Sequence, residues 1–428
     1  MNPTIELESL YSANNYAPLP VVLTRGEGVY VWDDAGKRYL DMMGAYSAVS
    51  HGHCHPKLVK ALCDQAAVLA VTSRAFYTDK LGPFLKQACE LTGMDRALAM
   101  NSGAEAVETA LKAARKWAYT VKGVRPGKAE IISCANNFHG RTLAIISMST
   151  DPQYQSGFGP FIPGMKTIHY GDTEALELAI TPHTAAFLLE PIQGEGGINI
   201  PPAGYLKKCA EICQKNNVLF LVDEIQTGLG RTGKFLACEH EGVKPDGLML
   251  GKALGGGLLP ISLFLARKDV MDVFQPGDHG STFGGTPLAA AVGLEALKVL
   301  VEEDLIARSA ESGKYLLSRL RELNSPLIKE VRGRGLMIGL EIVAKFDAHA
   351  LCLGFMERGL LTKETHKTVI RLAPPLTITR EQIDEAVDII KATLTAAEPE
   401  TETETEAPEV QDSQDSPDSP EVPADKEI

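Results

Sequence analysis

The sequence has no long apolar run, no clustered cysteines and no excess of basic charge. No stretch approaches the roughly 20 consecutive apolar residues of a membrane-spanning helix, so a membrane protein is not expected. The N-terminus has neither an apolar signal region nor an Arg-rich leader, so neither secretion nor mitochondrial import is expected. Eight cysteines scattered over 428 residues do not form a disulfide framework. These absences favour a cytoplasmic globular protein.

The acidic charge of the chain is concentrated at one end. Of the net charge of −13, −11 comes from residues 398–428, which leaves −2 for the rest. The nearly neutral body gives no reason to expect nucleic-acid binding. Residues 398–428 carry Thr-Glu repeats, Ser-Pro pairs and no aromatic residue. They cannot bury enough apolar surface to offset the entropy of ordering, so a disordered acidic tail is expected.

The order of apolar segments predicts an α/β fold with two domains. Between residues 46 and 285, apolar strand-like runs alternate with helical stretches, which is typical of a mostly parallel sheet flanked by helices. Residues 286–397 contain longer helical segments and later strand-like ones, which predicts a smaller α+β domain. Residues 1–45 are predicted to be an arm that packs with the small domain. The individual elements expected here are strands at 29–32, 38–40, 336–342 and 369–372 and helices at 288–303, 305–323 and 380–395.

Two apolar runs end in charged residues. Residues 218–222 lead into Asp223, and residues 248–250 are followed by Gly251 and Lys252. In open α/β sheets ligands bind at the carboxyl ends of the strands. A lysine and an aspartate there suit pyridoxal phosphate, because the lysine can form a Schiff base and the aspartate can pair with the protonated pyridine nitrogen. Taken alone, a single lysine after an apolar run is usually a solvated strand end.

Two further segments fit the same cofactor. A strand at 97–100, a turn through Ser102 and Gly103, and a helix at 104–116 would aim free backbone N–H groups at a phosphate. An ordinary helix N-cap is the alternative. After a strand at 130–134, Phe138 could stack on a flat ring and Arg141 could bind a carboxylate in a bidentate manner. A core phenylalanine and a surface arginine are the alternative.

Two patterns that suggest other ligands are incomplete. Residues 228–235 nearly match a nucleotide-binding phosphate loop, but Phe235 stands where Ser or Thr must bind magnesium. His51, His53 and His55 alternate in a loop, but no carboxylate or second Cys/His group completes a tetrahedral set. Neither a nucleotide nor a metal is predicted.

Taken together, these motifs resemble those of class III pyridoxal-phosphate-dependent aminotransferases. Asp223 and Lys252 have the spacing of that family, and the resemblance runs from about residue 11 to about residue 397. It implies fold type I, with residues 46–285 as the cofactor-binding domain. The segments that carry it, in the family's order, are 101–106 (NSGAEA), 138–142 (FHGRT), 190–197 (EPIQGEGG), 223–228 (DEIQTG), 251–252 (GK) and 281–285 (STFGG).

The resemblance also implies roles around pyridoxal 5'-phosphate. Lys252 would form the Schiff base and carry the proton, and Asp223 would keep the ring nitrogen protonated. Thr282 would reach the phosphate of the neighbouring subunit, which makes a homodimer the smallest complete unit. The other cofactor contacts would come from Ser102, Gly103 and Ala104 to the phosphate, Phe138 to the ring face and Gln226 to the ring hydroxyl.

Within the class, residues 14–20 and 46–49 resemble ornithine aminotransferases, which transfer the δ-amino group of ornithine to 2-oxoglutarate. By that resemblance, Arg141 holds the ornithine α-carboxylate, and Glu195 masks Arg371 until the second substrate binds. The remaining substrate contacts would be Tyr16 and Tyr46. One departure is His139, where animal ornithine aminotransferases carry Trp.

Three alternatives stay open. The amine donor could be acetylornithine or 4-aminobutyrate, the chain could be a catalytically silent binding protein, and Glu195 and Arg371 could form only a structural ion pair.

Overall fold

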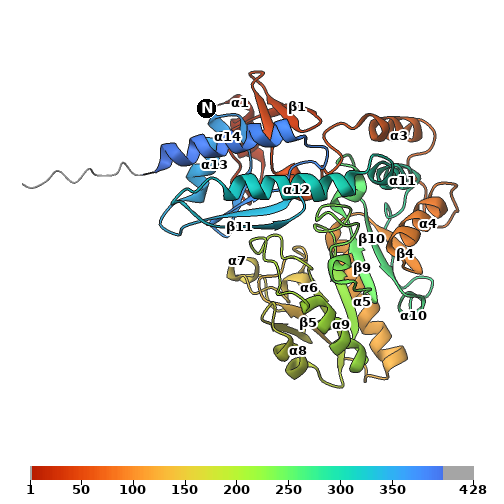
Figure 1. Ribbon diagram of the computed structural model, residues 1–428. Helices are drawn as coiled ribbons and strands as arrows, with labels where there is room; N and C mark the ends of the chain where they lie inside the picture. The colour runs from red at the N-terminus through yellow and green to blue at the C-terminus, as the bar shows by residue number, and fades with distance from the viewer. Residues whose placement is uncertain (1, 399–428) are drawn as a thin grey trace, which may run out of the picture. The chain divides into compact units, whose positions relative to one another are not determined.

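A seven-stranded sheet forms the centre of the computed structural model, which describes residues 2–398 (Figure 1). The strand order is β4–β10–β9–β8–β7–β5–β6. β10 runs antiparallel to both of its neighbours, and the strands from β9 to β6 run parallel to one another. The strands are β4 (Arg96–Met100), β5 (Glu130–Cys134), β6 (Met165–Ile168), β7 (Thr184–Leu189), β8 (Leu219–Asp223), β9 (Gly247–Leu250) and β10 (Ser262–Ala266). The predicted mostly parallel sheet is confirmed.

Helices cover both faces of this sheet, which explains the continuous apolar runs. Along β8, Leu219 and Leu221 belong to the core under α5 (Gly103–Trp117). Phe220 and Val222 belong to the core under α9 (Tyr205–Lys215). Successive side chains of a strand point to opposite faces, so every position of β8 is buried.

Two smaller sheets flank this centre. One has the order β1–β2–β3–β13 and includes the predicted strand pair as β2 (Tyr30–Asp33) and β3 (Arg38–Asp41). β1 (Leu23–Glu27) and β13 (Leu360–Leu361) were not predicted, and β13 pairs parallel with β3. The other sheet is antiparallel, in the order β11–β12–β15–β14. Its strands are β11 (Ile328–Arg334), β12 (Met337–Ile342), β14 (Lys363–Thr365) and β15 (Val369–Leu372).

Helices α12 and α14 run side by side above the second small sheet (Figure 1). The helices of this half are α11 (Pro287–Glu302), α12 (Leu305–Arg321), α13 (Ala348–Glu357) and α14 (Arg380–Ala397), which confirms the three predicted helices. The others are α1 (Pro3–Tyr11), α2 (Gly44–Ser47), α3 (Pro56–Ala66), α4 (Leu81–Thr92), α6 (Leu143–Ile146), α7 (Pro152–Gln155), α8 (Thr173–Ala179) and α10 (Lys268–Met271), with shorter turns at Ala118–Lys122, Ala237–Glu241 and Lys252–Gly255.

The chain up to Ala397 clusters as one compact unit, so the predicted boundaries after residues 45 and 285 stay predictions. The acidic tail from residue 399 lies outside the described residues. No helix between residues 2 and 398 is long and apolar enough to cross a membrane.

Candidate active site

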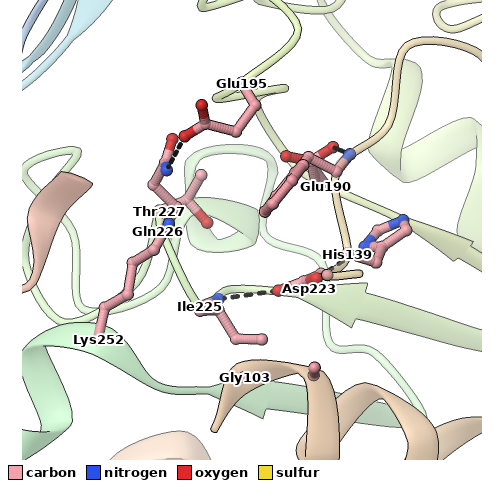
Figure 2. Close-up of a pocket in the computed structure, with 12 residues that line it drawn as sticks. Gly103, His139, Glu190, Glu195, Asp223, Ile225, Gln226, Thr227 and Lys252 are labelled. Carbon is pink, nitrogen blue, oxygen red and sulfur yellow. Dashed lines mark hydrogen bonds and ion pairs between the residues drawn. The ribbon is translucent and has the colours of Figure 1, made fainter. Parts of the chain in front are cut away.

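Three neighbouring parallel strands deliver charged residues to one cavity at their carboxyl ends. Asp223 ends β8, Lys252 follows β9 and Glu190 follows β7. All three line a cavity of about 190 Å³ (Figure 2). Asp223 and Lys252 were predicted to meet there, but Glu190 was not singled out. The signal that marks Asp223, an entirely buried strand ending in an acid, also marks Glu190.

Lys252 is an unpaired amine in this cavity. It has a left-handed backbone conformation, with φ of 45°. Burial lowers the pKa of Lys252 to about 8, and the charge of Arg371 acts in the same direction against Glu195, Asp223 and Glu190. Within residues 2–398, no side chain or carbonyl forms a hydrogen bond with its Nζ. The amine is therefore partly neutral, and nucleophilic, near physiological pH.

Asp223 is held by His139. Nδ1 of His139 lies 2.7 Å from Oδ2 of Asp223, and the Ile225 N–H donates to Oδ1 at 3.0 Å. Burial alone would lower the pKa of His139, but its hydrogen bond to Asp223 and the charges of Asp223 and Glu190 outweigh burial and raise it. The buried Nε2 of His139 has no partner within the described chain. Asp223 thus lines the cavity with both of its oxygens held by hydrogen bonds.

Glu190 joins the two loops above the cavity. Its carboxylate accepts hydrogen bonds from the backbone N–H of Phe138 at 3.0 Å and of Gly194 at 3.2 Å. Burial, together with the charge of Asp223, raises the pKa of Glu190 to about 7. Glu190 therefore sets how the Phe138 loop sits against the turn that carries Glu195.

The start of α5 closes the floor of the cavity. Ser102 caps the helix by accepting from the Glu105 N–H, and Ser262 Oγ donates to the Ser102 carbonyl at 2.7 Å. The N–H groups of Gly103 and Ala104 lie in the first turn, where a helix offers them no acceptor. A Cβ at Gly103 would lie 3.0 Å from Ile225, so the Gly103 backbone packs directly against Ile225, which also lines the cavity. This is a ready site for an anion.

Thr282 is exposed and does not line this cavity. Its neighbour Ser281 accepts a hydrogen bond from Asn101 Nδ2 at 2.7 Å. The structure therefore places the Thr282 loop beside the start of α5 but does not bring its hydroxyl to the site of the same chain.

Glu195 and Arg371 form a buried ion pair. Arg371 Nη1 donates to Glu195 Oε1 at 2.5 Å. Gln226 Nε2 donates to the same oxygen at 3.1 Å (Figure 2). Burial works to raise the pKa of Glu195, but the charges of Arg371 and Lys252 and these hydrogen bonds outweigh it and lower the pKa. Arg371 is only 2% exposed, and its Nε and the Oε1 of Gln226 are buried without partners among residues 2–398. These unpaired atoms suit a polar ligand.

The ring of Tyr46 lies against the guanidinium group of Arg371. The guanidinium carbon lies 4.6 Å from the centre of the Tyr46 ring. Tyr46 sits in a left-handed turn in which Gly44, Ala45, Tyr46 and Ser47 have φ of 53°, 45°, 59° and 77°. A Cβ at Gly44 would lie 2.5 Å from the Ala373 carbonyl oxygen, so this turn is pressed against the chain just after Arg371.

Arg141 and Tyr16 are both exposed on the surface of the protein. The exposed Arg141 stacks on Tyr154, with 3.7 Å between the guanidinium carbon and the ring centre, and Phe138 lies 5.6 Å away. Tyr16 is 77% exposed, and Lys363 Nζ donates to the carbonyl of the next residue, Ala17. Nothing in the sequence marked Tyr154, which lies in the four-residue helix α7.

The three alternating histidines each contact a different element. Their ring nitrogens reach the Ala296 carbonyl, the Asp41 carboxylate and the Glu303 carboxylate at 3.0, 2.8 and 3.2 Å respectively. They join loops and helices rather than converging on one point.

Comparison with known proteins agrees with this geometry. The family described as aminotransferase class-III matches residues 11–394. The ornithine aminotransferase of Geobacillus sp. (strain WCH70) is 59% identical over 387 residues, which is 90% of this chain and 97% of that relative. The ornithine aminotransferase of Exiguobacterium sp. (strain ATCC BAA-1283 / AT1b) is 57% identical over 393 residues, which is 92% of this chain and 98% of that relative.

Solved structures with the same fold include two differently named enzymes. The ornithine aminotransferase from Toxoplasma gondii ME49 is 48% identical, with a TM-score of 0.91 over 92% of this chain and 94% of that one. The acetylornithine aminotransferase from Elizabethkingia anophelis is 49% identical, with a TM-score of 0.84 over 92% of this chain and 98% of that one.

Proposed function

Because the chain belongs to the aminotransferase class-III family, we propose that its site transfers the δ-amino group of L-ornithine to 2-oxoglutarate, giving glutamate 5-semialdehyde and glutamate. One observation carries the substrate assignment. The site has two arginines, of which Arg141 is exposed and Arg371 is masked by Glu195. A donor that presents its distal amine and an acceptor that presents its α-position need their carboxylates held in different places.

The cofactor is pyridoxal 5'-phosphate, and the residues present fit it. Bound there, it supplies a carbonyl carbon that takes up the amino group and a ring that accepts electrons from the substrate carbon. Lys252 would hold that carbon, Asp223 the ring nitrogen and Phe138 the ring face. The unpaired Oε1 of Gln226 suits the ring hydroxyl. The phosphate would lie at the start of α5, on Ser102, Gly103 and Ala104.

Lys252 also moves the proton. Once freed by the substrate amine, its neutral Nζ would take a proton from the substrate carbon and pass it to the cofactor carbon that takes up the amino group. The lowered pKa of Lys252 keeps part of the amine in the form that this step requires.

The two arginines divide the work between the two half-reactions. With ornithine, Arg141 binds the α-carboxylate and Tyr16 the α-amine, while Glu195 keeps Arg371 occupied. With glutamate or 2-oxoglutarate, Glu195 leaves, Arg371 takes the α-carboxylate and Arg141 the distal one. Tyr46 limits the space beside Arg371 in both cases.

Steady-state rates with different amine donors test this function. We expect kcat/KM for ornithine to exceed those for acetylornithine and 4-aminobutyrate. Acetylornithine is the second candidate, since a relative 49% identical in sequence carries that name. Faster turnover of acetylornithine would overturn the substrate assignment and leave the family unchanged.

A substitution of Glu195 tests the division of work. Glu195→Ala should raise glutamate turnover relative to ornithine turnover, because α-amine attack becomes easier once Arg371 is permanently free. A purely structural ion pair would instead lower both half-reactions alike.

The working unit is a homodimer in the cytosol. Large apolar side chains are exposed, as an interface between two copies would require, and they include Phe283, next to Thr282 in sequence, and Phe76 and Tyr77. All eight cysteines are free thiols, which supports a reducing compartment.

A further inference from the structure

The turn that carries Glu195 is closed by backbone hydrogen bonds of its own. Gln193 and Asn199 exchange two bonds at its base, at 3.1 and 3.0 Å. Glu195 is followed by Gly196 and Gly197, and Gly197 has φ of 113°, a conformation that other residues rarely adopt. Two successive glycines leave the backbone free to change direction. The bonds within the turn do not bind the Glu195 side chain, so contacts from elsewhere in the chain also set where its carboxylate lies.

Arg332, on β11, supplies such contacts. Its Nη2 donates to the Gly197 carbonyl at 2.7 Å, and its Nε donates to the Ile198 carbonyl at 3.1 Å. Its Nη1 pairs with the carboxylate of Glu341. The side chains of Arg332 and Glu341 are each 14% exposed, so these bonds are largely shielded from water.

Arg332 and Arg371 lie on one row of the same sheet. Arg332 pairs with Gly339 across β11 and β12, and Gly339 pairs with Arg371 across β12 and β15. Residues paired in this way point to the same face. Gly339 leaves that face open between the two arginines, and Ile198 occupies the space, since a Cβ at Gly339 would lie 3.1 Å from its Cβ. The turn therefore lies across the row, with its carboxylate on one arginine and its carbonyls on the other.

Two other contacts from this sheet also hold the turn that carries Glu195. Thr365 Oγ1, on β14, donates to the Glu195 carbonyl at 2.6 Å. Ile198 packs against Met337 of β12 in a small buried cluster. The turn follows β7 of the large sheet in sequence, yet its tip is held by the sheet that carries Arg371.

We propose that Arg332 is a positioning residue for substrate selection: it fixes the glycine-rich turn so that the Glu195 side chain alone moves when Arg371 is masked or released. This inference rests on the function proposed above. It adds a residue that touches neither substrate nor cofactor.

Arg332→Lys tests the hydrogen bonds to the turn separately from the positive charge. Lysine can still pair with Glu341 but cannot donate to two carbonyls as a guanidinium does. With the turn loosened, Glu195 should mask Arg371 less well. We expect the ratio of kcat/KM for ornithine to kcat/KM for glutamate to fall about three- to tenfold. The matched control is Arg308→Lys. Arg308 Nη2 also donates to a backbone carbonyl, that of Thr377 at 2.7 Å, but Thr377 does not belong to the turn that carries Glu195. The control should leave the ratio unchanged.

Binding of glutarate to the cofactor-loaded enzyme, measured by calorimetry, gives a readout without turnover. Glutarate needs both arginines, so weaker masking should tighten its binding about three- to tenfold in Arg332→Lys. Valerate, with one carboxylate, should bind unchanged. In a Glu195→Ala background the effect of Arg332→Lys on glutarate binding should vanish, because the carboxylate that masks Arg371 is absent.

Gly339→Ala provides a second variant should Arg332→Lys fail to fold. Its Cβ would push on Ile198 from the sheet side and should shift glutarate binding in the same direction. Unchanged glutarate affinity in either folded variant, or an equal effect with and without Glu195, would overturn the proposal. Failure of wild-type enzyme to use ornithine would overturn the proposed function instead, and the glutarate measurements would still decide the role of Arg332.

Discussion

At the scale of single residues, two groups beside the same carboxylates have pKa values shifted in opposite directions. Asp223 and Glu190 act on both His139 and Lys252. His139 has a hydrogen bond of 2.7 Å to Asp223, and its pKa rises in spite of burial. Lys252 has no such bond, and burial lowers its pKa to about 8. A direct hydrogen bond, rather than the number of nearby charges, decides which group keeps its proton.

The shift at Lys252 predicts how the apoprotein captures its cofactor. Only the neutral amine attacks, so the rate of capture should follow the neutral fraction. With a pKa of about 8, that fraction rises about fivefold from pH 7 to 8 and about twofold from pH 8 to 9. Absorbance after mixing with pyridoxal phosphate measures the rate. A lysine peptide, with an ordinary pKa, should show about a tenfold rise per unit; the same steep rise in the protein would contradict the prediction.

The same pKa shift sets a direction for stability. Between pH 8 and about 10.5 the unfolded chain binds a proton at Lys252 that the folded chain does not. The contribution of this residue to the free energy of unfolding therefore increases as pH rises through that window and is constant below it.

At the scale of elements, the left-handed turn at Gly44–Ser47 is the most costly local structure near the site. A left-handed conformation costs about 1–2 kcal/mol per non-glycine residue, and Ala45, Tyr46 and Ser47 all adopt it. Contacts outside the turn offset this cost. Asp41 Oδ1 accepts from the N–H groups of Met43 and Gly44, each at 2.9 Å.

Glycine at position 45 should therefore stabilise the protein. Ala45→Gly removes the left-handed penalty, and we expect the free energy of unfolding to rise by about 0.5–1 kcal/mol after the added chain entropy is counted. Ala48→Gly is the matched control, because Ala48 has an ordinary φ of −76° and should lose stability. Urea unfolding measures both variants. Equal losses in the two would show that the turn carries no strain.

The long strands and helices were predictable, and the short or strained elements were not. Asp223 and Lys252 could be placed on one sheet edge because runs of buried residues precede both. β13 has two residues, too few for any periodicity. Ala-Tyr-Ser gives no sign of a left-handed turn, since these residues usually avoid one. Arg332 binds backbone carbonyls, which every sequence supplies, so no partner residue marks it.

At the scale of the whole molecule, the exposed aromatic side chains bear on assembly. In the proposed homodimer, we expect the second copy to cover Tyr77. Tyr77→Glu should then give a monomer with little activity at assay concentration, measured by sedimentation. Leu178→Glu is the control, since Leu178 is similarly exposed on α8 and should leave the dimer intact. An active wild-type monomer would contradict a site completed by two subunits.

The parallel pairing of β3 with β13 also has a consequence for synthesis. β3 ends at Asp41, and its partner β13 begins at Leu360. At 5–20 residues per second, a ribosome needs about 16–64 s to make the chain between them. Throughout that time β3 presents a row of unpaired backbone groups, the kind of open edge that invites pairing with another chain. A nascent chain halted before Leu360 is thus expected to aggregate, because the strand that covers this edge of β3 has not yet been made.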